Sequence, residues 1–230
     1  MPTALITGAS RGLGRAAAQA LARRGWSLIV DARRADDLAD AMRGLTGVVA
    51  VPGDVTDPRH RADLAAAVGR AGGLDALVNN ASQLGPSPQP LLRDYPLDEL
   101  GRVYGTNVVA PLALIQLLTA PLTAAAGTIV NVSSDAAVEA YPGWGGYGSA
   151  KAALDQLTAV LAAEEPSLHC YAFDPGDMRT DMHQQAFPGE DISDRPEPET
   201  VIPALLRLID ERPPSGRYRA TDLAVPAVTP

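Results

Sequence analysis

Tyr147 and Lys151 stand four residues apart in a segment with helical periodicity, so both side chains lie on one face of the predicted helix. A neighbouring ammonium group favours phenolate and lowers the pKa of a tyrosine from its ordinary value of about 10. Tyr147 would then donate and accept a proton close to neutral pH. The same spacing also occurs by chance, as an exposed pair on many helices.

Lys151 is the only lysine among the 19 lysine and arginine residues of the chain. Lysine suits this position better than arginine, because its ammonium is a compact point charge with three rotatable donors. Such a group can hold two ribose hydroxyls and still act on a phenol. Ser134 lies thirteen residues before Tyr147, at the end of a predicted strand. We therefore expect a chemical role for Lys151.

A glycine-rich turn directly follows the first predicted strand, Thr3–Thr7, and leads into a helix. Its glycines, Gly8, Gly12 and Gly14, would let the backbone approach a phosphate and let the helix pack closely on the strand. The free N–H groups of the helix N-terminus would face the anion. This pattern indicates a dinucleotide site, although a glycine turn between strand and helix is sometimes only a turn.

The composition is that of a globular protein, with 46% hydrophobic and 20% charged residues. A net charge of −8 argues against nucleic acid and anionic membranes as partners. One cysteine excludes an internal disulfide, and three scattered histidines give no metal-ligand spacing, so we expect no metal. Met1–Thr7 has no basic region typical of a signal peptide, and the apolar stretch Val108–Leu122 is short and interrupted. We expect a soluble, cytoplasmic protein.

Short apolar runs alternate with amphipathic segments along the chain. The predicted strands are Thr3–Thr7, Ser27–Ala32, Gly47–Pro52, Leu74–Asn79, Gly127–Ser133 and Leu168–Asp174. The predicted helices are Gly12–Arg24, Pro58–Arg70, Leu97–Ala125 and Tyr147–Ala163. This alternation predicts a single α/β domain over residues 1–230, with a doubly wound, Rossmann-type, mostly parallel sheet and helices on both faces.

Together these pieces resemble the short-chain dehydrogenase/reductase family over Met1 to Met182. The motifs occur in order along the chain: Thr7-Gly8-(x)3-Gly12-x-Gly14, Asp54-Val55, Asn79-Asn80-Ala81, Asn107, Ser134, Tyr147-(x)3-Lys151 and Pro175-Gly176-(x)3-Thr180. Each motif is unspecific by itself, whereas the set is specific. The resemblance implies about seven strands, and Gly216–Ala220 is the candidate for the last one.

The resemblance also implies roles for individual residues. Tyr147 would be the general acid in reduction and the base in oxidation, Ser134 would bind the substrate carbonyl, and Lys151 would hold the nicotinamide ribose. Asn107 would lie at a distortion of its helix and hold a water of the proton relay. The implied cofactor-binding residues are Gly8, Ser10, Arg11, Gly12, Leu13, Gly14, Arg33, Asp54, Val55, Asn79, Ala81, Tyr147, Lys151, Pro175, Gly176 and Thr180. Of these, Asp54 and Val55 would contact adenine, and Thr180 the nicotinamide carboxamide.

Charges after the second predicted strand bear on the choice of cofactor. A carboxylate there would bind the ribose 2′-hydroxyl of NAD, so Asp31 taken alone favours NAD(H). Counting from Gly25 in the family pattern, the acidic position of NAD-preferring members falls on Ala32, and the next residue is Arg33. Arg11, in the glycine turn, is a second partner for a 2′-phosphate. We therefore expect NADP(H), with NAD(H) as the alternative.

Two departures from the family pattern stand out. Ser82 occupies a position that is usually glycine, and we expect slight crowding there without loss of binding. The C-terminal part lacks the usual Val-Asp-Gly-Gly-like ending. Residues 184–203 are acidic and proline-rich, and we expect residues 181–203 to form a lid over the substrate in preference to a solvated loop.

Other pocket-edge residues leave alternatives open. Trp144 would be either a substrate wall or a loop anchor, and His183 is expected in a surface loop, with contact to substrate as the alternative. The two long apolar helices predict a homo-oligomer, most simply a dimer. The alternative is that their apolar faces pack only against the sheet.

The function predicted by the resemblance is hydride transfer between NADP(H) and a small-molecule carbonyl or alcohol. The alternatives are a cofactor-sensing module without turnover and an epimerase or dehydratase that retains its cofactor. The full set of Asn107, Ser134, Tyr147 and Lys151 argues against a sensor, since a sensor needs no acid.

Overall fold

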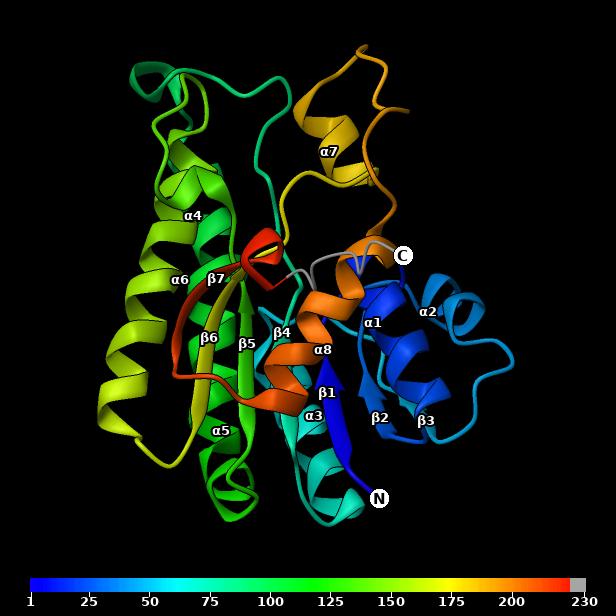
Figure 1. Cartoon of the computed structure of the whole chain (residues 1–230). Helices are drawn as coiled ribbons and strands as arrows, with labels where there is room; N and C mark the ends of the chain where they lie inside the picture. The colour runs from blue at the N-terminus through cyan, green and yellow to red at the C-terminus, as the bar shows by residue number, and fades with distance from the viewer. Residues whose placement is uncertain (224–230) are drawn as a thin grey trace, which may run out of the picture.

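Seven parallel strands form one sheet within residues 1–223, the part of the chain that the computed structural model describes (Figure 1). Their order across the sheet is β3-β2-β1-β4-β5-β6-β7. The strands are β1 (Thr3–Ile6), β2 (Ser27–Val30), β3 (Val48–Ala50), β4 (Ala76–Asn79), β5 (Thr128–Val132), β6 (His169–Asp174) and β7 (Gly216–Arg219). The predicted doubly wound α/β sheet of about seven strands is confirmed.

The strand order places a crevice at the centre of the sheet. From β1 the chain builds outward to β2 and β3, and it then crosses to β4 on the other side of β1. Strand β1 pairs with both neighbours, so that Ala4 lies opposite Leu28 of β2 and Ala76 of β4. In such sheets the loops after β1 and β4 diverge at their carboxyl ends, and ligands bind between them.

Helices cover both faces of the sheet (Figure 1). They are α1 (Gly12–Arg23), α2 (Ala35–Ala41), α3 (Pro58–Ala71), α4 (Leu97–Tyr104), α5 (Ala110–Ala124), α6 (Gly145–Glu164), α7 (Asp181–Ala186) and α8 (Ile202–Glu211). Successive strand residues point to opposite faces. Ala4 and Ile6 therefore join the core under α1 and α8, whereas Leu5 joins the core under α3 and α5.

The predicted helix Leu97–Ala125 is interrupted at its middle. A π-helical turn, Gly105–Val109, separates α4 from α5 and contains Asn107, as the expected helix distortion requires. The continuous helical path of 28 residues, Leu97–Ala124, is long and apolar enough to cross a membrane by length and composition alone. It is thus longer than the apolar stretch read from the sequence. Its residues Leu114 and Leu118 are buried against the sheet, whereas Val109 and Leu117 are exposed.

Three helices have no counterpart among the predicted elements. Helix α2 is short, α7 lies within the segment 181–203 that was expected to form a lid, and most of α8 follows that segment. Helix α8 buries Leu205, Leu208 and Ile209 in the same core as α1. Pro203 stands in the first turn of this helix, where proline is tolerated. Proline at this position hides the helical periodicity in the sequence.

Candidate active site

A cavity of about 1510 Å³ opens along the carboxyl ends of the strands. It runs from the glycine turn after β1 to the ends of β4, β5 and β6, and α7 covers part of it. Most of the predicted site residues line it, namely Gly8, Ser10, Arg11, Gly12, Leu13, Arg33, Asp54, Val55, Ala81, Ser134, Tyr147, Lys151, Pro175, Gly176 and Thr180. The cavity therefore joins the predicted cofactor end to the predicted catalytic end.

The glycine turn has the backbone geometry that glycine alone adopts readily. Gly8 and Gly12 have φ angles of 67° and 53°. A Cβ atom on Gly14 would lie 2.5 Å from the carbonyl oxygen of Gly8 and would also overlap the Asn80 side-chain amide. Gly14 thus allows α1 to pack against the end of β4, and it lies behind the turn, outside the lining of the cavity.

Asp31 supports this turn from beneath. It is 1% exposed, its Oδ1 accepts a hydrogen bond from the Gly8 N–H at 2.8 Å, and its Oδ2 lies 3.0 Å from His60 Nε2. Burial raises the pKa of Asp31, and the bonds from His60 and Gly8 oppose that rise. Asp31 lines the cavity, and both of its carboxylate oxygens have protein partners that hold it beneath the turn.

Arginine side chains surround the adjoining end of the cavity. Arg33 is exposed beside Asp54, while Ala32 is buried. Burial acts to raise the pKa of Asp54, but hydrogen bonds from the Thr56 N–H and hydroxyl, together with the charge of Arg33, hold it below its ordinary value. Arg15 of α1 also lines this end, and the motif analysis missed it because it lies just beyond the glycine turn.

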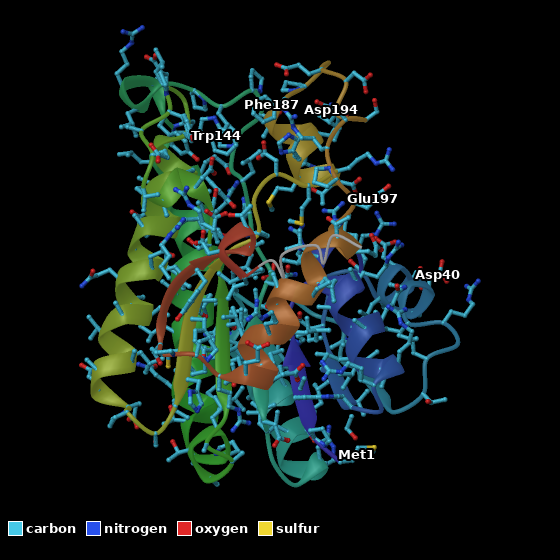
Figure 2. The ribbon with its side chains drawn as sticks, viewed as in Figure 1. Met1, Asp40, Trp144, Phe187, Asp194 and Glu197 are labelled. Atoms are coloured by element: carbon cyan, nitrogen blue, oxygen red, sulfur yellow. The ribbon has the colours of Figure 1, made fainter. Side chains whose placement is uncertain are left out.

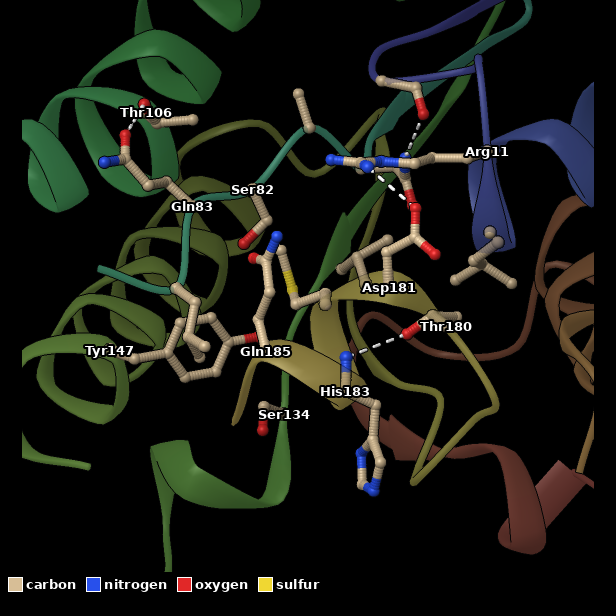
Figure 3. Close-up of a pocket in the computed structure, with 18 of the residues that line it drawn as sticks. Arg11, Ser82, Gln83, Thr106, Ser134, Tyr147, Thr180, Asp181, His183 and Gln185 are labelled. Atoms are coloured by element: carbon tan, nitrogen blue, oxygen red, sulfur yellow. Dashed lines mark hydrogen bonds and ion pairs between the residues drawn. The ribbon is translucent and has the colours of Figure 1, made fainter. Parts of the chain in front are cut away.

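Arg11 is engaged elsewhere in this structure. Its Nη1 lies 2.8 Å from Asp181 Oδ2, at the first residue of α7 (Figure 3). Both side chains are more than half exposed, so this ion pair contributes little stability and can open easily. Arg11 therefore connects the glycine turn to the segment predicted as a lid.

Ser134, Tyr147 and Lys151 meet at the opposite end of the cavity. The start of α6 places Tyr147 beside the end of β5, and both Tyr147 and Lys151 are buried. Lys151 Nζ donates to the carbonyl oxygen of Val132 at 2.6 Å and lies 5.5 Å from the centre of the Tyr147 ring. The Ser134 hydroxyl donates to Asp135 Oδ1 at 2.9 Å.

The expected lowering of the Tyr147 pKa is wrong for this structure. Burial raises the pKa of Tyr147 to about 12, and burial lowers the pKa of Lys151 to about 8. Both shifts have one cause, because a low-dielectric environment penalises the charged form of each group. Hydrogen bonds from Ser82 and Ser134 act in the other direction on Tyr147. The phenol is accordingly protonated at neutral pH.

Asn79 does not line the cavity, contrary to the sequence-based expectation, and Asn107 lies behind the lining residues. Asn107 is 1% exposed, and its Oδ1 accepts hydrogen bonds from Ser82 Oγ at 3.2 Å and from the Gln83 N–H at 2.8 Å. Asn79 is buried in β4 and donates to Asn131 Oδ1 at 2.8 Å. The next residue, Asn80, lines the cavity instead, because alternate strand residues face opposite ways.

Arg217 of β7 donates hydrogen bonds to three segments next to the site. The sequence motifs did not predict this role. Its Nη2 donates to the Ser134 carbonyl oxygen and to Asp174 Oδ2, both at 2.9 Å. Its Nε donates to Asp155 Oδ2 at 3.0 Å, one helical turn after Lys151. The last strand thus ties the ends of β5 and β6 to α6.

Aromatic side chains form one wall of the cavity near α7. The Trp144 ring lies 5.9 Å from the rings of both Tyr147 and Phe187, measured between centroids. Trp144 and Phe187 lie at the end of the molecule opposite Met1 (Figure 2). Trp144 therefore serves both as a cavity wall and as an anchor for neighbouring segments.

His183 differs from the surface-loop expectation. It lies in α7, its side chain is 9% exposed, and its ring packs 4.8 Å from that of Phe187. The Thr180 hydroxyl accepts a hydrogen bond from the His183 N–H at 3.2 Å and so caps α7, while Thr180 also lines the cavity (Figure 3). The helix forms here because its N-terminus is capped and its inner face is covered.

Ser82, Gln83 and Gln185 are further polar residues that line the cavity (Figure 3). The sequence motifs predicted only slight crowding at Ser82 and no role for the two glutamines. The one available signal was that serine replaces glycine after Asn79-Asn80-Ala81. Among the described residues, no group of three or more metal-ligating side chains lies together.

Comparison with known proteins agrees with this arrangement. The family model for short chain dehydrogenases matches residues 2–191. The chain belongs to the short-chain dehydrogenase family. Sepiapterin reductase of Mus musculus is 36% identical to this short-chain dehydrogenase over 199 residues, which cover 79% of this chain and 76% of the mouse protein.

Solved structures of dehydrogenases are similar to this chain over nearly its whole length. The short chain dehydrogenase from Shigella flexneri is 26% identical, with a TM-score of 0.87 over 100% of this chain and 94% of that one. An alcohol dehydrogenase from Thermococcus sibiricus, complexed with 5-hydroxy-NADP, is 25% identical with a TM-score of 0.84, over 95% of each chain.

The cavity of this short-chain dehydrogenase fits a nicotinamide dinucleotide. The positive φ angles of the glycine turn and the absence of side chains at Gly8 and Gly12 leave room for a pyrophosphate beside the N-terminus of α1. Arg33 stands at one end of the cavity and Lys151 at the other. Lys151 has one protein hydrogen bond among the described residues, to Val132, so donors remain for ribose hydroxyls.

Proposed function

We propose that this short-chain dehydrogenase is an NADP(H)-dependent oxidoreductase that interconverts a small carbonyl compound and its alcohol, with Tyr147 as general acid and base. The observation that carries the proposal is that Ser134, Tyr147 and Lys151 meet in the same cavity as the glycine turn. Nothing in a cofactor-binding module alone would require a buried phenol and a buried ammonium side by side.

The protein's own residues divide the work as follows. The bound nicotinamide would supply or accept the hydride. Tyr147, protonated at neutral pH because burial raises its pKa to about 12, would deliver a proton to the carbonyl oxygen. Ser134 would turn its hydroxyl from Asp135 toward that oxygen and stabilise the charge that grows there. Lys151 would bind ribose hydroxyls and stabilise the tyrosinate that remains.

The preference for NADP(H) rests on Arg33. Arg33 is exposed beside the cavity, the neighbouring Ala32 offers no carboxylate, and Asp31 is held under the glycine turn. A guanidinium can bind a 2′-phosphate through charge-assisted hydrogen bonds. The similar alcohol dehydrogenase from Thermococcus sibiricus is complexed with 5-hydroxy-NADP, which supports the same choice.

The substrate would lie between Tyr147 and the segment 181–203, which we propose to act as a lid. Leu84, Trp144 and Met182 give this part of the cavity an apolar wall, and Gln185 adds an amide. A compact carbonyl compound with a flat apolar part and one hydrogen-bonding group fits these walls. Because α7 joins the glycine turn through Arg11 and Asp181, the lid would respond to cofactor binding.

The test is turnover by the purified protein with NADPH and a panel of ketones and aldehydes, followed by the loss of reduced-nicotinamide absorbance. Sepiapterin belongs in the panel because of the similarity to the mouse reductase of that name. We expect turnover with at least one carbonyl, and loss of that turnover in Tyr147→Phe. Cofactor binding without any turnover would favour a sensor, and turnover without net change of the cofactor would favour an epimerase or dehydratase.

A further inference from the structure

Ser82 places a third hydroxyl group at the catalytic end of the cavity. It follows the end of β4, lines the cavity with Ser134 and Tyr147, and occurs where the family pattern has glycine. In Figure 3 the hydroxyls of Ser82 and Ser134 lie on opposite sides of the phenolic end of Tyr147. Both hydroxyls act to lower the pKa of the Tyr147 phenol, while in this structure each donates its hydrogen bond to another residue, Ser82 to Asn107 and Ser134 to Asp135.

The present partner of Ser82 holds it only loosely. The distance from Ser82 Oγ to Asn107 Oδ1 is 3.2 Å, whereas hydroxyl donors to oxygen acceptors usually lie at about 2.7–2.8 Å. Asn107 Oδ1 also accepts from the Gln83 N–H at 2.8 Å. The loss of a hydrogen bond is costly when it leaves a buried acceptor unpaired. Asn107 Oδ1 would keep its hydrogen bond from Gln83, so the Ser82 hydroxyl can turn away without that cost.

The Ser134 hydroxyl is less free to serve the phenol. It donates to Asp135 Oδ1 at 2.9 Å, and the Ala136 N–H donates back to it at 3.2 Å. If Ser134 turns toward the substrate oxygen, the phenolic oxygen of Tyr147 needs a different donor. Ser82 is the hydroxyl on its other side.

We propose that Ser82 is a catalytic residue of the proposed carbonyl reduction, whose hydroxyl turns from Asn107 to the phenolic oxygen of Tyr147 as that oxygen loses its proton. In reduction the Tyr147 O–H bond breaks, its electron pair stays on the phenolic oxygen, and the proton bonds to the substrate oxygen. Ser82 keeps its own proton and shares it with the tyrosinate. Alcohol oxidation runs the same steps in reverse.

The charges around Tyr147 make such a donor valuable. Burial and the carboxylates of Asp135 and Asp174 all disfavour tyrosinate. The ammonium group of Lys151, from the same helix, lies 5.5 Å from the centre of the Tyr147 ring. It donates a hydrogen bond to the carbonyl oxygen of Val132. A hydrogen bond to the charged form lowers a pKa, so removal of the Ser82 hydroxyl should raise that of Tyr147.

The first test is the pH dependence of kcat/KM for alcohol oxidation. Ser82→Ala removes the hydroxyl and keeps the Cβ atom, and it should move the pH at which tyrosinate forms upward by about one unit. Below that pH its rate should fall about tenfold. Ser82→Thr should restore the wild-type profile. Ser149→Ala is the matched control, because Ser149 is exposed on α6 and its hydroxyl also donates one hydrogen bond, to the carbonyl oxygen of Gly146.

The second test needs neither substrate nor cofactor, and so separates this inference from the proposed function. Protein labelled with 3-fluorotyrosine, a more acidic phenol, is titrated by fluorine NMR, and the Tyr147 signal is assigned by its loss in Tyr147→Phe. The Tyr147 pKa should rise by about one unit in Ser82→Ala. Ser82→Gly, the residue of the family pattern, gives the same measurement if the alanine variant does not fold.

An unchanged titration in both variants would overturn the role of Ser82 even if the enzyme reduces carbonyls as proposed. A shifted titration in a protein that turns over no carbonyl would instead refute the proposed function and keep the hydrogen bond. An active enzyme whose pH profile is identical in wild type and Ser82→Ala would also overturn the inference.

Discussion

Replacing Lys151 with arginine should disable this short-chain dehydrogenase even though the positive charge is kept. Lys151 is 2% exposed, and its Nζ donates to Val132 at 2.6 Å from a position beneath the Tyr147 ring. A planar, bulkier guanidinium cannot occupy the place of an ammonium at that distance without moving its neighbours. It would displace both the ribose contacts and the phenol.

The expected loss follows from that displacement. A shift of about 1 Å at a reacting group can cost about 100-fold in rate. At about 1.36 kcal/mol per tenfold, this corresponds to about 2.7 kcal/mol of transition-state stabilisation. We therefore expect Lys151→Arg to lower kcat by at least about 100-fold with the fold intact, and Tyr147→Phe to lower it as much or more.

The assay is steady-state carbonyl reduction by Lys151→Arg, Tyr147→Phe and the double variant, with circular dichroism to verify folding. Lys151→Met is the control, because it removes the positive charge that Lys151→Arg keeps. The double variant should be little worse than the worse single one, because the two residues act as a unit. A Lys151→Arg enzyme with near-native kcat would refute the geometric argument and leave positive charge as the sole requirement.

The pH dependence gives a second check on the same residue. Burial lowers the pKa of Lys151 to about 8, so the ammonium is present below that pH and is lost as the pH rises through it. The affinity for NADPH should accordingly weaken above about pH 8 in the wild type. In Lys151→Arg the guanidinium stays charged, so titration calorimetry across this range should show no such step.

Three further predictions concern the cofactor, the lid and assembly. Arg33→Ala should reduce the preference for NADPH over NADH, expected to be at least about tenfold or ~1.4 kcal/mol, as measured by titrating both cofactors. Asp181→Ala breaks an exposed ion pair worth about 1 kcal/mol or less, so Tm should barely change, while the freed Arg11 tightens NADPH binding by up to about fivefold. We also propose a dimer that pairs the outer faces of α5 and α6, where Leu117 is 49% exposed. Leu117→Glu should convert it to a monomer in light scattering, and a monomeric wild type would refute the proposal.

Local sequence patterns were sufficient for most of the fold. The strand predicted as Ser27–Ala32 is β2, and the one predicted as Leu168–Asp174 is β6, each within two residues at its ends. Their parallel arrangement followed from strands that alternate with helices. Helix α8 was missed because Pro198 lies just before it and Pro203 in its first turn, and its packing against α1 became visible only in the structure.

Some positions in the motifs depend on backbone geometry alone. Gly8 and Gly12 were expected to let the backbone approach a phosphate, and each has a positive φ. The interruption of the helix at Asn107 was expected as well. The roles of these residues, and those of Ser134, Tyr147 and Lys151, stay predictions for the experiments above.

Only the tertiary structure decided which neighbour each polar side chain meets. Asp31 could bind a ribose or support the glycine turn, and the buried contact with Gly8 and His60 decides for the turn. The spacing of Tyr147 and Lys151 predicted a lowered phenol pKa, yet burial raises the pKa of Tyr147 and lowers that of Lys151. Spacing along the chain determines which side chains share a face. Desolvation and hydrogen bonding depend on all the segments that close around them, and these come from distant parts of the sequence.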